Sequence, residues 1–183
     1  MNAPFALTRE SIRAADLRQP DEAARIERFV ADRAGALFHR PAWLLAAQRG
    51  TGQRARGLLA EKGGAITGWL PLSEIHSPIF GRMLASSGFA VGGGVLAERE
   101  ATAQALCRAA EELAGRLSCP TIELRGGPAP EDWTTRTDSH GGFAADLAND
   151  DEAQLLAITK RQRAEVRKGL EQDLVIGVGA GLQ

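Results

Sequence analysis

The chain has 183 residues, of which 44% are hydrophobic and 25% are charged, and its formal net charge at pH 7 is −1. This composition is typical of a globular domain with a sizeable core and excludes a largely disordered chain. The near-neutral charge excludes a protein that binds nucleic acid over its whole surface, so any polyanion site has to be local.

The two cysteines, Cys107 and Cys119, lie outside any CxxC motif and away from any histidine at ligand spacing, so the sequence predicts no metal site. Two scattered cysteines fit a reducing compartment. The first residues lack the apolar segment of a signal peptide, and no run approaches the length of about 18 apolar residues that a membrane helix needs. We therefore expect a cytoplasmic protein without a membrane span.

Two helices are expected near the start of the chain. In residues 21–35, apolar side chains recur at helical spacing among charged ones, and Gly35 closes the run. Further along, Pro41 suits the first turn of a helix and Gly50 suits its end. These short helices precede the first predicted strand.

A β-hairpin is predicted next. Its strand candidates are 54–61 and 65–75, and the sequence Lys-Gly-Gly at 62–64 is the expected turn. Residues 76–82 are expected to form a loop. A short strand that begins at Met83 then leads into a glycine-rich segment.

The glycine-rich segment, residues 88–94, has two interpretations. Its glycines can serve a tight turn or bulge, or they can let a substrate approach the backbone. The segment does not follow the pattern GxGxxG. After it come the clearest helix of the chain, 97–119, which is rich in alanine and leucine, and a short buried strand at 121–124.

The last third of the chain mixes further short elements. Residues 143–147 are a strand candidate, and 149–158 predict a helix that is capped by Asn149 or Asp150. A strand-like run at 174–179 ends the pattern. Strands and helices are therefore mixed along the whole sequence, which predicts an α/β (α+β) fold with a mixed central sheet flanked by helices.

Between these elements, Thr159 opens a strongly basic helix through the capping-box pattern Thr-x-x-Gln. At 100° per residue, its five basic side chains fall within about 160° of arc. They are Lys160, Arg161, Arg163, Arg167 and Lys168. One interpretation is a solvated helix face. The other is a polyanion site, because arginine donors match phosphate oxygens in pairs and acids are nearly absent from this face.

Isolated histidines, tryptophans and one cysteine are the remaining candidates for a site. A lone histidine can act as a general base, but none has a visible nucleophile or carboxylate partner in the sequence, so each is expected to have a structural role. Trp43 and Cys107 are expected to be core residues, whereas Trp133, in an irregular segment, is left open between the core and a substrate platform. The residues are His39, His76, His140, Trp43, Trp133 and Cys107.

The sequence resembles the FemAB family, in the subgroup found with exosortase (PEP-CTERM) and exopolysaccharide systems. The resemblance rests on the stretch from "FHRPAWLL" to "GGGVLA", on "CPTIELRGGP", on "GFAADLANDDEAQLLAI" and on the basic segment "TKRQRAEVRKGLEQDLVI". It covers residues 10 to 176. It implies two tandem lobes, each built like a GNAT acyltransferase, with 1–142 as the first lobe and 143–183 as the beginning of a second.

The family uses aminoacyl-tRNA, or an acyl donor, to transfer amino acids or acyl groups to envelope precursors. By this likeness, the five basic residues of 160–168 would meet phosphates of tRNA or of a nucleotide-linked precursor. The acetyl-CoA signature [QR]-x-x-G-x-[GA] is not matched; "RARGLL" at 54–59 comes nearest but ends in leucine. We therefore expect no acetyl-CoA cofactor, and the sequence identifies no catalytic residue.

Family members are about twice as long, so by this likeness the chain is expected to be a fragment, a truncated gene product or a half-protein, whose second lobe a second copy or a partner chain can complete. Two other functions remain open. The chain can be a non-catalytic binding or assembly module with a GNAT-like fold, or a fragment that binds tRNA through its cationic helix with a steep salt dependence.

Overall fold

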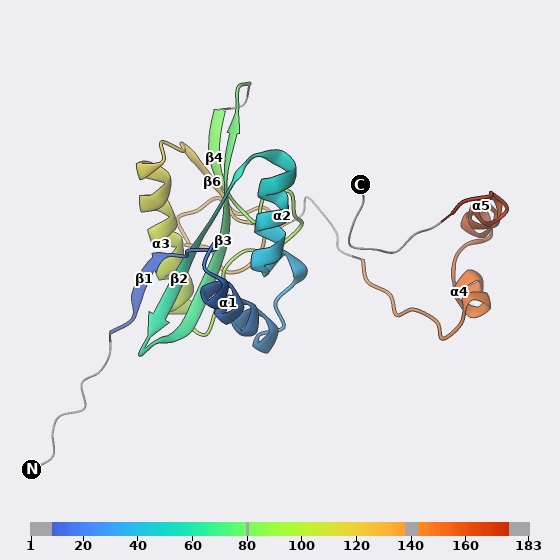
Figure 1. The fold of residues 1–183 in the computed structure, drawn as a ribbon, viewed down its shortest axis with the longest axis horizontal. Helices are drawn as coiled ribbons and strands as arrows, with labels where there is room; N and C mark the ends of the chain where they lie inside the picture. Colours follow the sequence, from blue (N-terminus) through green and yellow to red (C-terminus); the bar gives the residue numbers. More distant parts are fainter. Residues whose placement is uncertain (1–8, 80, 138–142, 176–183) are drawn as a thin grey trace, which may run out of the picture. The chain divides into compact units, whose positions relative to one another are not determined.

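The computed structural model describes residues 9–79, 81–137 and 143–175, and divides the chain into two units, Met1–Thr135 and Arg136–Gln183 (Figure 1). The first unit holds the sheet and its covering helices, and the second holds two short helices. The expected boundary between two lobes, after residue 142, lies outside the described ranges. The division into two GNAT-like lobes therefore stays a prediction.

A mixed sheet forms the centre of the first unit. Its strand order is β1 (Ser11–Ala14), β2 (Arg54–Lys62), β3 (Ala65–Ser77), β4 (Gly81–Ser86) and β6 (Thr121–Glu123), and β5 (Leu96–Ala97) also pairs with β3. The neighbours from β1 to β4 are antiparallel, whereas β4 and β6 are parallel. The predicted α/β fold class with a mixed sheet is confirmed.

The hairpin of β2 and β3 follows from its turn. Gly63 and Gly64 both have positive φ, 59° and 80°, and Lys62 pairs with Ala65. A two-residue turn with two left-handed positions matches the twist of the flanking strands. The predicted hairpin is confirmed, although β3 continues through His76 and Ser77, which the sequence places in a loop.

Helices cover both faces of this sheet (Figure 1). On one face, α3 (Glu100–Arg116) packs on a core that contains Leu58, Leu70 and Leu106. On the other face, α1 (Pro20–Asp32) and α2 (Pro41–Thr51) pack on a core that contains Leu59 and Trp69. Successive side chains of a strand point to opposite faces, so neighbours such as Leu58 and Leu59 enter different cores.

The ends of the first two helices differ from the prediction by a residue or two. In α1 the left-handed position after the helix is taken by Ala34, with φ 50°, and not by Gly35. A Cβ at Gly35 would lie 2.8 Å from Val30 Cγ1, so glycine is needed there for close packing. In α2 the left-handed position is Gly52, with φ 73°, and not Gly50.

One sequence expectation about strands was wrong, and one strand was missed. The edge strand β1 was not foreseen, because four residues carry too little pattern to be recognised before their partner, β2, is known. Residues 143–147 form no strand; Phe143 and Leu147 are 99% and 82% exposed, so this apolar run has no face to bury. In the last strand candidate, Leu174 and Val175 are irregular, and residues 176–179 lie outside the described residues.

The helices of the second unit agree with the sequence. In α4 (Asp151–Ala157), the Asp150 side chain accepts a hydrogen bond from Ala153 N at 2.7 Å, which decides between the two predicted caps. In α5 (Lys160–Leu170), Thr159 and Gln162 form the predicted capping box. None of the described helices of the chain is both long and apolar enough to cross a membrane.

The glycine-rich segment packs against another backbone segment. A Cβ at Gly94 would lie 1.7 Å from Gly126 O, and Gly92 and Gly93 have φ of 98° and 86°. These glycines therefore serve left-handed turns and a close approach of two backbone segments. The structure favours the first of the two interpretations that the sequence left open.

This packing yields a stability prediction. We expect Gly94→Ala to lower the free energy of unfolding by about 1–3 kcal/mol, because backbone has to shift to admit the new methyl group. Gly115→Ala is the control: its Cβ meets nothing within 4 Å and it lies in α3, so about 0.5–1 kcal/mol of stabilisation is expected. Urea unfolding followed by tryptophan fluorescence measures both, since all three tryptophans lie in the first unit. Unchanged stability of Gly94→Ala would contradict the close approach.

Candidate functional site

The five predicted basic residues share one exposed face of α5. Four of them are exposed, and Arg163 is half-buried. Lys168 forms an i,i+3 ion pair with Glu165 at 3.2 Å, and no other basic residue of the five has an ion pair within the described part of the chain. The Nε of Arg163 is buried and has no hydrogen-bond partner there. Apart from Lys168, the basic residues of the helix therefore present donors that no described acid neutralises.

The apolar edge of α5 is also uncovered within the second unit. Val166 and Leu170 are 41% and 73% exposed, and no residue of α4 or α5 is buried. The capping box accounts for why this helix begins at Lys160, since it satisfies backbone N–H groups that have no partner inside the helix. Binding of phosphate by this face remains a prediction.

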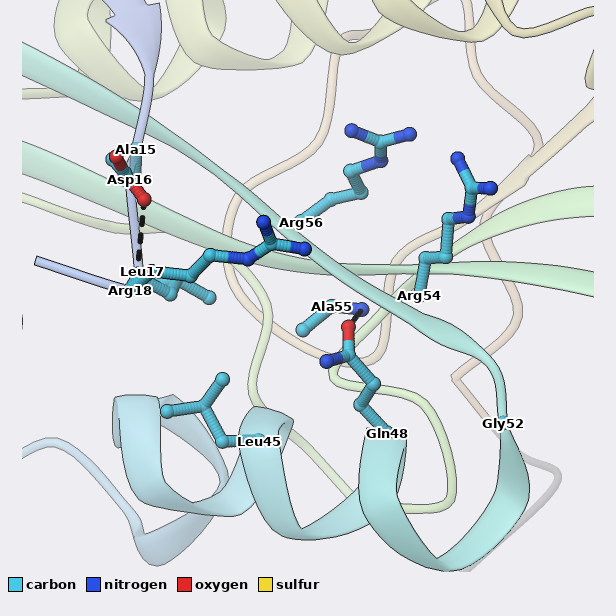
Figure 2. Close-up of a pocket in the computed structure, with 10 residues that line it drawn as sticks. All are labelled: Ala15, Asp16, Leu17, Arg18, Leu45, Gln48, Gly52, Arg54, Ala55 and Arg56. Atoms are coloured by element: carbon cyan, nitrogen blue, oxygen red, sulfur yellow. Dashed lines mark hydrogen bonds between the residues drawn. The ribbon is translucent and has the colours of Figure 1, made fainter.

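The first unit contains a groove that the sequence did not predict. It follows the edge of β2 beyond β1: Ala15 N donates to Gly57 O at 2.9 Å, and then the chain turns away from the strand. From α2, Gln48 Oε1 accepts a hydrogen bond from Ala55 N at 2.8 Å (Figure 2). The groove has a volume of about 650 Å³. It is an open hollow along an incomplete sheet edge.

Three arginines line this groove. Arg54 and Arg56 are two positions apart on β2 and so lie on the same face of the strand, and Arg18 comes from the segment that follows β1 (Figure 2). Neither Arg18 nor Arg54 has an ion pair among the described residues. Asp16 also lines the groove, but its Oδ1 already accepts a hydrogen bond from the backbone N of Arg18 at 3.1 Å.

The third arginine, Arg56, is held by a buried carboxylate. Glu74 accepts hydrogen bonds from Arg56 Nη2 at 2.8 Å and Nε at 3.1 Å on one oxygen, and from Arg82 Nη2 at 2.9 Å on the other. Burial pushes the pKa of Glu74 upward, but these bonds and the charges of Arg56 and Arg54 outweigh burial and hold the pKa below its usual value. Glu74 is therefore an ionised anchor at neutral pH.

The histidines have structural surroundings where they are described. His39 Nδ1 accepts a hydrogen bond from Ala36 N at 3.0 Å and closes a short helix, Leu37–His39, and burial lowers its pKa. Its backbone oxygen accepts from Trp69 Nε1 at 2.8 Å. His76 lies near the end of β3 with its backbone bonded to Gln53. His140 lies outside the described residues.

The tryptophans and Cys107 likewise belong to the packing. Trp43 is half-buried and meets Phe38 edge-on, with ring centroids 4.8 Å apart. Trp133 Nε1 donates to Glu111 Oε1 at 2.8 Å and the ring packs on the α3 core. Cys107 is fully buried, and burial raises the pKa of its thiol to about 11. The core position expected for Cys107 is confirmed, Trp43 packs on Phe38 as a structural residue, and Trp133, which the sequence left open, packs against the α3 core.

Buried serines near the end of β4 are occupied by hydrogen bonds as well. Ser86 Oγ accepts from Arg125 N at 2.7 Å, Ser73 Oγ accepts from Gly88 N at 3.1 Å, and Ser87 Oγ donates to Phe38 O. None of the three hydroxyls is hydrogen-bonded to a histidine, the contact that would activate it as a nucleophile. Among the described residues, no group of three or more metal-ligating side chains comes together.

No family model and no curated protein matches the chain. Among solved structures, it is similar to a ribosomal-protein-alanine N-acetyltransferase from Brucella melitensis biovar Abortus 2308, at 18% identity and a TM-score of 0.47, over 73% of this chain and 100% of that one. A GNAT family acetyltransferase from Staphylococcus aureus gives 16% identity and a TM-score of 0.47, over 75% and 98%. Likeness at this level does not extend to an activity, a cofactor or a substrate.

The groove was missed because its arginines are far apart in the sequence. Arg54 and Arg56 alternate along a predicted strand, which is a signal that they share a face. Arg18 joins them only through the pairing of β1 with β2, which the sequence did not reveal. The basic helix was recognised because all its charges lie within a few turns of one element.

The buried carboxylate predicts a pH-dependent stability. Because the folded-state pKa of Glu74 is lowered from 4.5, its contribution is complete above that value and is lost as pH falls through the folded-state pKa. We expect Glu74→Gln to lower the free energy of unfolding by about 1–3 kcal/mol at pH 7, with a smaller difference from wild type below about pH 4. Glu112→Gln, an exposed residue of α3, is the control. A difference that is the same at pH 7 and pH 3 would contradict the ionised anchor.

Both cysteines are predicted to be inert in the folded protein. Burial raises the pKa of both thiols, and the thiolate is the reactive form. Neither should react with a disulfide reagent such as DTNB at pH 8, whereas both should react after unfolding in guanidinium chloride. Fast labelling of Cys107 or Cys119 in the native chain would show that the α3 core opens.

Proposed function

We propose that the chain is a FemAB-like acyl- or aminoacyltransferase, or the N-terminal part of one, that acts in the cytoplasm in cell-envelope or exopolysaccharide biogenesis. The observation that carries the proposal is the exposed cationic face of α5. Among the described residues, only Lys168 of this face is paired with an acid. The mixed sheet with helices on both faces is compatible with the lobe that the sequence resemblance implies.

In this proposal, the arginines and lysines of α5 hold the phosphates of aminoacyl-tRNA or of a nucleotide-linked precursor. An acceptor amine attacks the activated acyl carbon, an amide bond forms, and the ester or thioester bond to the donor breaks. The proton of the amine is lost, and the alcohol or thiol of the donor leaves. Positioning of the two substrates and stabilisation of the oxyanion supply most of the rate.

Two alternative functions use the cationic face of α5 for binding alone and involve no group transfer. A binding or assembly module would hold a polyanion or partner and transfer nothing. A tRNA-binding fragment would bind RNA phosphates through α5, and its affinity would fall steeply with salt. Either alternative is compatible with the hydroxyls of Ser73 and Ser86, which accept hydrogen bonds from backbone N–H groups, and with the buried thiol of Cys107.

The double variant Arg163→Glu/Arg167→Glu tests the role of α5. We expect it to weaken binding of a fluorescein-labelled RNA hairpin at least tenfold, because two donors are replaced by repelling charges. The slope of log K against log salt should also become shallower, by about 0.7–0.9 for each phosphate that the variant no longer neutralises. Fluorescence anisotropy at several salt concentrations measures both quantities.

The matched control is Arg28→Glu/Arg116→Glu, which changes the net charge equally but lies on α1 and α3, at exposed arginines. If the control weakens binding as much as the α5 variant, the effect is one of net charge and α5 is not the site. Circular dichroism of Arg163→Gln/Arg167→Gln, which removes the charges without reversing them, checks that the helix is retained.

Transfer is measured separately from binding. The chain is incubated with radiolabelled aminoacyl-tRNA, or with acyl-CoA, and an amine-bearing envelope precursor, and the amide product is sought by mass spectrometry. Formation of an amide that Arg163→Glu/Arg167→Glu abolishes supports the transferase. RNA binding without any amide product supports the binding module instead.

A further inference from the structure

We propose that the groove along the edge of β2 binds a phosphorylated small molecule, with Arg18, Arg54 and Arg56 as the donors to its phosphate. This site lies within the first unit and does not rest on the function proposed for α5.

The balance of charge around the groove favours an anion. Three arginines, Arg18, Arg54 and Arg56, and one carboxylate, Asp16, line the groove. Glu74 of β3 and Arg82 of β4 form an ion pair beyond the groove, so together they add no net charge. The carboxylate of Asp16 accepts a hydrogen bond from a backbone N–H, and that of Glu74 is saturated by Arg56 and Arg82. An excess of two positive charges matches a phosphate dianion better than a monocarboxylate.

The donors that remain free belong to different segments. Arg56 gives Nε and Nη2 to Glu74 and keeps Nη1 for a ligand. Glu74 is 7% exposed and fixes Arg56 on the strand, so this donor is preorganised. Arg18 and Arg54 keep all their guanidinium donors, since neither forms an ion pair or a side-chain hydrogen bond in the described residues. Arg54 and Arg56 extend from one side of β2, Arg18 comes from the segment after β1 (Figure 2), and guanidinium forks match phosphate oxygens.

The walls of the groove leave room for an organic group on that phosphate. Leu17 and Leu45 supply apolar surface beside the sheet edge, together with the small side chains of Ala15 and Ala55. The volume of about 650 Å³ falls within the range of small-molecule sites, and it exceeds what a bare phosphate fills. In Figure 2, Leu45 and Gln48 rise from α2 toward the strand, and Arg54 and Arg56 extend from the strand on the side away from α2. The phosphate end and the apolar end of a ligand thus have different surroundings.

The test uses phenyl phosphate as the probe and benzoate as its carboxylate counterpart. Titrations by calorimetry are made on the Arg163→Glu/Arg167→Glu chain, so that α5 does not contribute. We expect one saturable site for phenyl phosphate, with benzoate at least tenfold weaker. Arg18→Gln/Arg54→Gln on that background should weaken phenyl phosphate at least tenfold, whereas Arg116→Gln, an exposed arginine of α3, should leave it unchanged.

Each other outcome overturns the proposal. Absence of saturable binding at millimolar phenyl phosphate rules out the site, and equal loss in the Arg116→Gln control shows a nonspecific charge effect. Benzoate that binds as tightly as phenyl phosphate means a carboxylate site and contradicts the choice of phosphate. Arg18 and Arg54 are exposed, so their replacement should spare the fold, and tryptophan fluorescence checks this. Amide chemical shifts that move at Arg18, Gln48 and Ala55 locate the ligand independently.

Discussion

The alternation of side chains along β3 is the constraint on which the first unit depends. This strand is buried on both faces over Thr67 to Glu74: Trp69 enters the core of α1 and α2, and Leu70 and Leu72 enter the core of α3. Glu74 follows at the same spacing, so the apolar face of the strand ends in a carboxylate. That carboxylate binds Arg56 of β2 and Arg82 of β4, one from each neighbouring strand. The same pairing of β2, β3 and β4 therefore positions both the apolar side chains of the core and the arginines around Glu74.

Glycines make room for this arrangement. A Cβ at Gly57 would lie 2.1 Å from the ring of Trp69, and a Cβ at Gly68 would lie 2.8 Å from Leu106 and from Thr102. The large indole of Trp69 fits because Gly57, on the neighbouring strand, has no side chain there. In the same way, α3 can pack close to the sheet because Gly68 has no side chain. The same principle joins the glycine-rich segment to Gly126. Close packing against side chains at Gly57 and Gly68, and against backbone at Gly94, accounts for these glycines.

The two cationic surfaces arise in different ways. In α5 the five basic residues lie within nine positions of the sequence, and the helix begins at a capping box that the sequence predicts. In the groove, Arg18 lies far along the chain from Arg54 and Arg56, and the pairing of β1 with β2 brings it there. A local cationic face offers many similar donors in a row, which suits a polyanion. A groove that combines a few arginines with apolar walls suits a single small ligand.

The sequence by itself determined the β2–β3 hairpin, the long helix α3, the capped helix α5 and its one-sided charge. These features depend on interactions between residues a few positions apart: a two-glycine turn, a helical repeat and a side chain that caps its own helix. Only the tertiary structure decided the edge strand β1, the parallel pairing of β4 with β6, the irregular course of 143–147 and the arginine groove. Each of these depends on which distant segment lies alongside. A short apolar run becomes a strand only where a sheet edge is free to receive it, and separated arginines form a site only where strand pairing brings them together.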